Sequence, residues 1–189
     1  MPNNVVITGE KYVGKSTIVR ELIEQLNLTA GGFVVGRNGS FDQWLSFYLS
    51  DPLAYYEKQK DESFNFEKNC QIFAKRGNVE EKWDIRPDVF DTLGVKLLEN
   101  GLQHRDIVLM DELGRFELKA NKFQQKVFEI LDIPTPVIAV LKDEHNKFLD
   151  KVRSREDVDI YRIKKNNNDI IFDKIYEKLE NIINNKNKE

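Results

Sequence analysis

Residues 9–17 have the amino-acid types and the spacing of a loop that wraps the phosphates of a nucleotide. The segment consists of Gly9, Glu10, Lys11, Tyr12, Val13, Gly14, Lys15, Ser16 and Thr17. Its two glycines let the backbone turn tightly and point its N–H groups toward an anion. In this pattern the lysine reaches the β- and γ-phosphates, and the serine hydroxyl is placed to ligate Mg²⁺. The segment therefore predicts a site for a nucleoside triphosphate and Mg²⁺, with Lys15 binding phosphate and taking part in catalysis.

A second segment ends an apolar strand in two acids. It consists of Ile107, Val108, Leu109, Met110, Asp111, Glu112, Leu113 and Gly114. In a doubly wound α/β fold the carboxyl ends of the strands meet at the edge where ligands bind, so we expect both segments to form one nucleotide site. Asp111 is then placed to hold Mg²⁺ through water, opposite Ser16, and Glu112 to orient or deprotonate an attacking water. The alternative is that the two acids only cap the segment that follows.

Attack by water on a γ-phosphate also needs positive charge where the phosphoryl group loosens. The candidate residues are Lys15, Lys11, Arg115, Arg153 and Arg155. Arg115 directly follows the second segment, and Arg153 and Arg155 flank a serine in an arrangement suited to a short lid. For each of these arginines the alternative is an ordinary place on the protein surface, where most arginines lie.

The elements around both segments alternate between strands and helices. Residues 5–7 are an apolar run of strand type, and residues 16–26 place apolar side chains on one helical face. Further buried strands are expected at 107–110, 136–141 and 160–163, and further helices at 87–100, 119–131, 145–152 and 169–183. This order predicts an α/β P-loop NTPase fold with a mainly parallel sheet and helices on both faces.

An antiparallel β insertion is expected over residues 34–83, after the first strand–helix unit. Its candidate strands are 43–50, 53–56 and 69–74. Its aromatic residues include Phe41, Trp44, Phe47, Tyr48, Tyr55, Tyr56, Phe64 and Phe66. Such residues either line a pocket for a base or a phosphate acceptor or, as is more common, cover a face of the sheet. We predict a single domain over residues 1–183, followed by a polar tail at 184–189.

The composition is typical of a globular protein of ordinary domain size. The chain has 189 residues and a net charge of −3, which gives no basic footprint for nucleic acid or an anionic membrane. Its single cysteine, Cys70, excludes an internal disulfide and is expected to be a buried structural thiol. No apolar run approaches the roughly 18–20 residues that a membrane span requires, and a signal peptide is not expected. We expect a cytoplasmic enzyme that binds a nucleoside triphosphate and neither nucleic acid nor a membrane; the sequence indicates no protein partner.

Residues 111–118, Asp-Glu-Leu-Gly-Arg-Phe-Glu-Leu, followed by Phe123, resemble a signature of one known family. That signature is Asp-Glu-Ile-Gly-x-Met-Glu-Leu…Phe, and the family is the nucleoside-triphosphatase family first known from thermophiles. The same family has a Gly-x-Pro-Gly-Val-Gly-Lys-Thr-Thr loop, a Gly-Gly-Phe strand as at residues 31–33, and an Asn-Arg-Asp just before the last helix. The resemblance runs over roughly residues 4–180 and is strongest at the two nucleotide segments.

This chain departs from the family pattern at three places. Lys11 and Tyr12 stand where the family has proline and glycine, Arg37 is all that remains of a Glu-x-x-Arg motif, and residues 167–169 read Asn-Asn-Asp. The family is similar to small kinase-like P-loop proteins and hydrolyses several nucleoside triphosphates with Mg²⁺. The resemblance therefore implies the same Mg²⁺-dependent activity for this chain.

Three functions remain open at the level of sequence. The first is a Mg²⁺-dependent nucleoside-triphosphatase acting on the γ-phosphate of ATP- or GTP-type nucleotides. It is favoured because a nucleotide switch needs only the aspartate, whereas the Asp-Glu pair suits hydrolysis. The second is a kinase that moves the γ-phosphoryl group to a small acceptor held by the insertion. The third is a nucleotide-binding regulatory module with little turnover.

Overall fold

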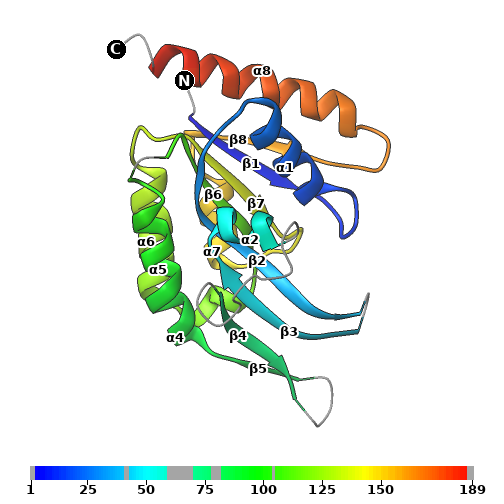
Figure 1. Ribbon diagram of the computed structural model, residues 1–189, viewed down its shortest axis with the longest axis vertical. Coiled ribbons are helices and arrows are strands. Elements are labelled where there is room, and N and C mark those ends of the chain that lie inside the picture. Colours follow the sequence, from blue (N-terminus) through cyan, green and yellow to red (C-terminus); the bar gives the residue numbers. More distant parts are fainter. Residues whose placement is uncertain (1–2, 41–42, 59–69, 78–81, 104, 187–189) are drawn as a thin grey trace.

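A sheet of eight strands organises the computed structural model, which describes residues 3–40, 43–58, 70–77, 82–103 and 105–186 (Figure 1). The strands lie in the order β5-β4-β3-β2-β6-β7-β1-β8. They are β1 (Asn4–Thr8), β2 (Ala30–Ser40), β3 (Gln43–Ser50), β4 (Cys70–Arg76), β5 (Trp83–Ile85), β6 (Ile107–Leu113), β7 (Val137–Leu141) and β8 (Val158–Arg162). From β2 through β6, β7 and β1 to β8, neighbouring strands are parallel, which confirms the predicted mainly parallel sheet.

The helices lie on both faces of this sheet, as the sequence predicts. They are α1 (Lys15–Gln25), α2 (Pro52–Lys58), α4 (Pro87–Val89), the π-helical turn η1 (Phe90–Gly94), α5 (Val95–Asn100), the 3₁₀ turn η2 (Phe116–Lys119), α6 (Asn121–Leu131), α7 (Lys147–Arg153) and α8 (Asn168–Lys186). Helices α1 and α8 lie together on one face, and α4, α5 and α6 cover the other (Figure 1). Because α8 extends to Lys186, residues 184–186 belong to this helix and not to the predicted polar tail. Residues 187–189 lie outside the described residues.

Two apolar layers pack against opposite faces of the central strands. Along β1, Val5 and Ile7 face the layer that contains α1 and α8, whereas Val6 faces the layer that contains α5, α6 and α7. Side chains of β6 alternate between the two layers in the same way. Strands that are buried on both faces are typical of a parallel sheet covered by helices. Strands β1 and β6 flank β7 and both pair with it in parallel, so they end at the same edge of the sheet.

Strand β2 joins the parallel sheet to the antiparallel insertion. Residues 30–34 pair in parallel with β6, and residues 34–40 pair in antiparallel fashion with β3. Strands β3, β4 and β5 continue the antiparallel pairing. The predicted antiparallel insertion is therefore confirmed, although the strand that begins it starts earlier, within the parallel sheet.

One predicted strand of the insertion is wrong, because residues 53–56 lie in helix α2. Asp51 accounts for the difference: its Oδ1 accepts hydrogen bonds from the N–H groups of Leu53 (2.9 Å) and Ala54 (3.2 Å). An aspartate at the N-cap, followed by proline at the first helical position, is a strong start signal for a helix. The predicted aromatic residues Phe41, Phe64 and Phe66 lie outside the described residues.

Two expectations from composition concern the core and the membrane. Cys70 is buried in β4, as expected of a structural thiol. In the described part of the chain, no helix combines the length and the apolar character needed to cross a membrane.

Candidate nucleotide-binding site

The loop of residues 9–14 joins β1 to α1 and presents the N-terminus of that helix. Gly9 and Gly14 adopt positive φ values of 143° and 98°. A Cβ atom on Gly9 would lie 2.4 Å from the carbonyl oxygen of Ile163, so only glycine fits there without a shift of the backbone. Gly14 is the N-cap of α1, and no side chain of the described residues caps this helix end. The N–H groups and the dipole of α1 therefore favour an anion at this position.

The side chain of Lys15 points back toward the start of the phosphate loop. Its Nζ donates hydrogen bonds to the carbonyl oxygens of Gly9 (2.8 Å) and Glu10 (2.6 Å). Burial lowers the pKa of Lys15 below its usual value, while the charges of Glu112 and Asp111 act in the opposite direction. The structure thus brings the predicted lysine within the electrostatic field of both predicted acids.

Asp111 and Ser16 meet at the carboxyl edge of the sheet. Asp111 is 8% exposed, and its carboxylate accepts a hydrogen bond from the Ser16 hydroxyl. Burial and the neighbouring Glu112 charge raise the pKa of Asp111 to about 6. The pair offers only oxygen donors, the type that Mg²⁺ prefers. Within the described ranges no group of three or more His, Cys, Asp or Glu side chains is placed to hold a metal, so a cation here would need further oxygens, such as those of a phosphate.

Glu112 lies between two basic side chains. Its Oε1 is 2.8 Å from Nζ of Lys142, its Oε2 is 3.0 Å from Nη2 of Arg37, and its side chain is 14% exposed. Burial alone would raise the pKa of Glu112, but the charges of Lys142, Arg37 and Lys15 outweigh burial and hold the pKa below its usual value. Glu112 is therefore an ionised carboxylate near neutral pH, fixed in direction by two ion pairs.

Lys142 and Arg37 are site residues that the motifs do not predict. Lys142 directly follows β7, the strand next to β6, so its place after a buried run is a signal that sequence reasoning could have used. Arg37 lies on β2, three residues after Val34, which pairs with Asp111. The register of that pairing follows from packing in three dimensions, and the sequence carries no local signal for it.

The structure places two of the predicted charge-stabilising arginines beside the site without directing them to it. Arg115 is exposed, and its guanidinium lies 5.7 Å from the centre of the Phe116 ring. Arg153 donates a hydrogen bond to the carbonyl oxygen of Lys142 (2.7 Å) and so supports the backbone of a residue that contacts Glu112.

Arg155 lies at the other end of the parallel strands. It pairs with Asp132 (2.7 Å) and Asp157 (2.6 Å), and Asp157 also accepts a hydrogen bond from Asn4. Because Asn4 is the first residue of β1 and the phosphate loop follows its last, the strand length separates Arg155 from the loop. Arg155 is therefore not brought to the site, and the predicted lid does not form there.

Several residues predicted to bind nucleotide are buried in the sheet and reach no ligand with their side chains. Those with 0% exposure are Ile107, Val108, Leu109, Met110 and Leu113. Their contribution is to extend β6 through the core and so to place Asp111 and Glu112 at its end. Glu10, Lys11 and Tyr12, in contrast, are exposed in the phosphate loop.

The turn after β6 is held by a buried acid that was not predicted as a site residue. Glu117 is 1% exposed, and its Oε2 accepts a hydrogen bond from the N–H group of Gly114 (3.0 Å). Burial raises the pKa of Glu117 to about 7. Glu117 thereby fixes the chain directly after the two acids.

A cavity of about 310 Å³ lies over the acid pair. Its walls are formed by Ser16, Thr17, Arg20, Val35, Arg37, Trp44, Tyr55, Tyr56, Asp111 and Glu112. The aromatic residues of the insertion thus divide between the two roles left open by the sequence. Trp44, Tyr55 and Tyr56 line this cavity, whereas Phe47 and Tyr48 are buried in the sheet.

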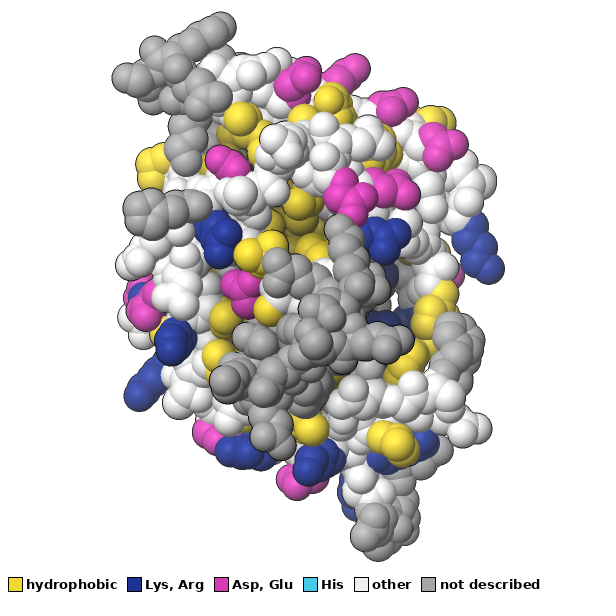
Figure 2. Space-filling model, viewed as in Figure 1, with side chains coloured by type: hydrophobic (Ala, Val, Ile, Leu, Met, Phe, Trp, Pro, Cys, Tyr) yellow, Lys and Arg dark blue, Asp and Glu magenta, His cyan; other side chains and the backbone are white. Residues whose placement is uncertain are grey.

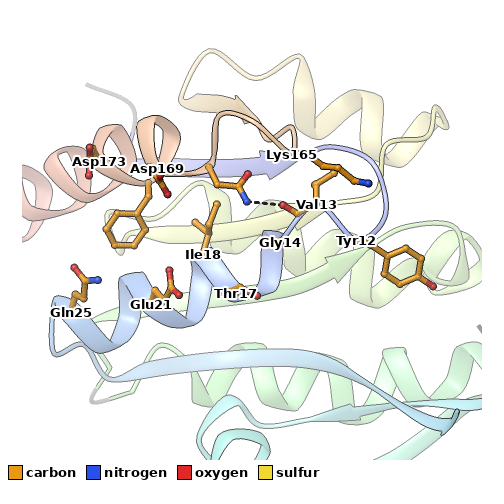
Figure 3. Close-up of a pocket in the computed structure, with 12 residues that line it drawn as sticks. Tyr12, Val13, Gly14, Thr17, Ile18, Glu21, Gln25, Lys165, Asp169 and Asp173 are labelled. Carbon is orange, nitrogen blue, oxygen red and sulfur yellow. Dashed lines mark hydrogen bonds between the residues drawn. The ribbon is translucent and has the colours of Figure 1, made fainter. Parts of the chain in front are cut away.

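A second cavity, of about 770 Å³, lies on the other side of the loop, between α1 and the start of α8 (Figure 3). Its walls are formed by Tyr12, Val13, Gly14, Thr17, Ile18, Glu21, Gln25, Lys165, Asn168, Asp169, Phe172 and Asp173. A hydrogen bond from Asn168 Nδ2 to the Val13 carbonyl oxygen (3.0 Å) ties α8 to the loop. Acidic side chains gather over this end of the molecule, along α1 and α8 (Figure 2).

The parallel sheet, the glycine loop and the acid pair at its edge together define a P-loop nucleotide-binding protein. A family model described as NTPase matches residues 4–176. The chain belongs to this NTPase family, which confirms the resemblance found in the sequence and the predicted enzyme class, a nucleoside-triphosphatase.

Curated relatives match the chain over nearly its whole length, and solved structures share its fold. The nucleoside-triphosphatase THEP1 of Thermotoga maritima is 26% identical over 176 residues, which cover 93% of this chain and 95% of that protein. The same-named protein of Methanopyrus kandleri is 28% identical over 184 residues, with 94% and 95% covered. The crystal structure of THEP1 from Aquifex aeolicus has a TM-score of 0.71 at 22% identity and covers 94% of this chain and 99% of that one. The solution structure of a human cancer-related nucleoside triphosphatase has a TM-score of 0.68 at 18% identity, with 94% and 97% covered.

Proposed function

We propose that the protein hydrolyses the γ-phosphate of ATP- and GTP-type nucleoside triphosphates in a Mg²⁺-dependent reaction, with Glu112 as the base that activates water. The observation that carries this proposal is the ionised, doubly paired Glu112 carboxylate in the same cavity as Ser16 and Asp111. In the reaction, the water oxygen attacks the γ-phosphorus, the bond to the β–γ bridging oxygen breaks, and the water proton passes to Glu112.

The triphosphate would lie along the glycine loop. The N–H groups of residues 9–17 and the N-terminus of α1 bind its oxygens, and Lys15 exchanges the carbonyls of Gly9 and Glu10 for phosphate. The γ-phosphate then points toward Asp111 and Glu112, and the nucleoside end lies toward the 770 Å³ cavity beside α8.

Ser16 and Asp111 would hold Mg²⁺, because they present a hydroxyl and a buried carboxylate side by side. When bound, the ion supplies positive charge to the β- and γ-phosphate oxygens. Lys15, Arg37 and Lys142 supply the remaining positive charge, in place of the arginines predicted at 115, 153 and 155. A single-domain cytoplasmic enzyme remains our expectation.

Phosphate release from ATP, GTP, CTP and UTP, each with and without Mg²⁺, tests the proposal. We expect steady multiple turnover with Mg²⁺ and loss of activity when EDTA removes the ion. Release that is equally fast in EDTA would contradict the metal site at Ser16 and Asp111. Turnover far below about 1 s⁻¹ with all four nucleotides would instead favour a regulatory nucleotide-binding module.

A further inference from the structure

The cavity over the acid pair is much larger than one attacking water molecule. A water molecule has a share of liquid volume of about 30 Å³, whereas this cavity measures about 310 Å³. Its volume lies at the lower end of the range of small-molecule sites, which starts at about 300 Å³. Ser16, Asp111 and Glu112 line the end of this cavity that receives the γ-phosphate, so the space for a second small molecule is the part toward Trp44, Tyr55 and Tyr56.

Three aromatic side chains line the cavity together with the two acids. Trp44 comes from β3, and Tyr55 and Tyr56 come from α2, where their ring centres lie 5.6 Å apart at a steep angle. Tyr56 lines the same cavity as Asp111 and Ser16. Aromatic side chains offer flat apolar faces on which a planar ring can stack.

Two arginines stand in the same cavity. The guanidinium of Arg37 lies 5.8 Å from the centre of the Trp44 ring and is ion-paired with Glu112. Arg20 is four residues after Ser16 on α1, so that both side chains share one face of the helix. A guanidinium group can donate two parallel hydrogen bonds to the oxygens of one phosphate, so Arg20 and Arg37 give the cavity two groups that can bind a phosphate.

We propose that this cavity binds a nucleoside monophosphate, and that the protein transfers the γ-phosphoryl group to it. The base stacks on the aromatic side chains that line the cavity, Trp44, Tyr55 and Tyr56, and the acceptor phosphate is bound by Arg20 and Arg37. This inference rests on the proposed binding of a triphosphate at the glycine loop. When no monophosphate is bound, water takes the place of the acceptor and the same site hydrolyses the triphosphate.

The transfer balances without a further reagent. An oxygen of the acceptor phosphate attacks the γ-phosphorus and forms a new P–O bond, and the bond from the γ-phosphorus to the β–γ bridging oxygen breaks. The donor leaves as a nucleoside diphosphate with that electron pair, and the acceptor becomes a second nucleoside diphosphate. A phosphate monoester has a second pKa of about 6, so the acceptor is largely deprotonated at neutral pH and no base is needed.

The test uses the full-length protein with Mg²⁺ and ATP labelled in the γ-phosphate. Labelled products are separated after incubation with AMP, GMP, CMP or UMP, and in parallel with the four nucleosides. We expect at least one monophosphate to receive label at a rate roughly tenfold or more above the release of free phosphate. Arg20→Gln should lower the ratio of transfer to release roughly tenfold, the loss of one charged phosphate contact, whereas Arg86→Gln, which replaces a 55%-exposed arginine in the ion pair with Asp88, should leave that ratio unchanged.

Binding of the non-hydrolysable analogue AMP-PNP and of the monophosphate in its presence, both measured by calorimetry, separates the two proposals. Free phosphate as the sole labelled product, with the analogue bound, would overturn the acceptor site and leave hydrolysis intact. Label on a nucleoside hydroxyl, or a transfer ratio that Arg20→Gln does not change, would also overturn it. A protein that neither binds the analogue nor turns over ATP would contradict the proposed function, and the acceptor site would fall with it.

Discussion

Replacing Glu117 with glutamine should remove a pH dependence of stability that this buried carboxyl imposes. The side chain is 1% exposed, and burial raises its pKa to about 7 despite hydrogen bonds from the N–H groups of Gly114 and Glu117 itself. Near neutral pH the folded protein therefore holds a proton on Glu117 that the unfolded chain releases. Glutamine keeps the size of the side chain and an acceptor oxygen but does not titrate.

The size of the effect follows from the two pKa values. The carboxyl has a pKa of 4.5 in the unfolded chain and about 7 in the fold. Its stabilising contribution is therefore fully present below the unfolded value and is lost as the pH rises through the folded value. One pKa unit corresponds to about 1.4 kcal/mol, so between about pH 5 and pH 8 the wild-type protein should lose about 2–3 kcal/mol from this group.

Urea unfolding at both pH values, without nucleotide or metal, measures this loss. The free energy of unfolding of the wild-type protein should fall by about 2–3 kcal/mol more than that of Glu117→Gln over the interval. The exposed Glu180, replaced in the same way, serves as the control and should leave the wild-type slope unchanged. If wild type and Glu117→Gln lose stability in parallel, Glu117 is ionised in the fold and the reasoning from its burial is refuted.

Three further predictions concern the nucleotide site. Gly9→Ala should cost about 1–3 kcal/mol of stability and weaken nucleotide binding, because its Cβ would meet the Ile163 carbonyl at a φ of 143°; calorimetry of unfolding and of binding checks both. Lys142→Gln should lower kcat roughly 10–100-fold and move the acid limb of the rate profile to higher pH, because the lost ion pair lets the pKa of Glu112 rise. The apparent affinity for Mg²⁺ should fall as the pH drops through about 6, because Asp111 must be ionised to bind a cation; Asp111→Asn should abolish this dependence and weaken Mg²⁺ binding throughout, as measured by metal titration of phosphate release.

The sequence predicts those parts of the site that depend on local geometry. The glycine at 9 needs a positive φ, the lysine at 15 follows a helix cap, and the acids at 111 and 112 end a buried run. Each of these features depends only on neighbouring residues in the chain, so a local sequence pattern is enough to predict it. The order of strands and helices along the chain can be predicted in the same way, because the spacing of apolar residues shows which side chains of each element are buried.

The rest of the site depends on which strands become neighbours. Arg37 reaches Glu112 because β2 pairs with both β6 and β3, and Lys142 does so because β7 lies between β6 and β1. Arg155 is the opposite case. The sequence predicts it as part of a lid over the site, but the fold places it at the other end of the parallel strands. Helix α2 was missed because a short aromatic run resembles a strand, although the Asp51-Pro52 start signal was present.

The central claim is that Glu112 activates water on a triphosphate bound at the glycine loop, and one comparison tests it most directly. Phosphate release with Mg²⁺ and saturating ATP is measured for wild type, Glu112→Gln and Lys15→Ala, with nucleotide binding measured in the same preparations. We predict that Glu112→Gln binds ATP nearly as well as wild type and releases phosphate about 10²–10⁴-fold more slowly, whereas Lys15→Ala loses binding as well. Undiminished release by Glu112→Gln, alongside an inactive Lys15→Ala, would contradict the role assigned to the glutamate.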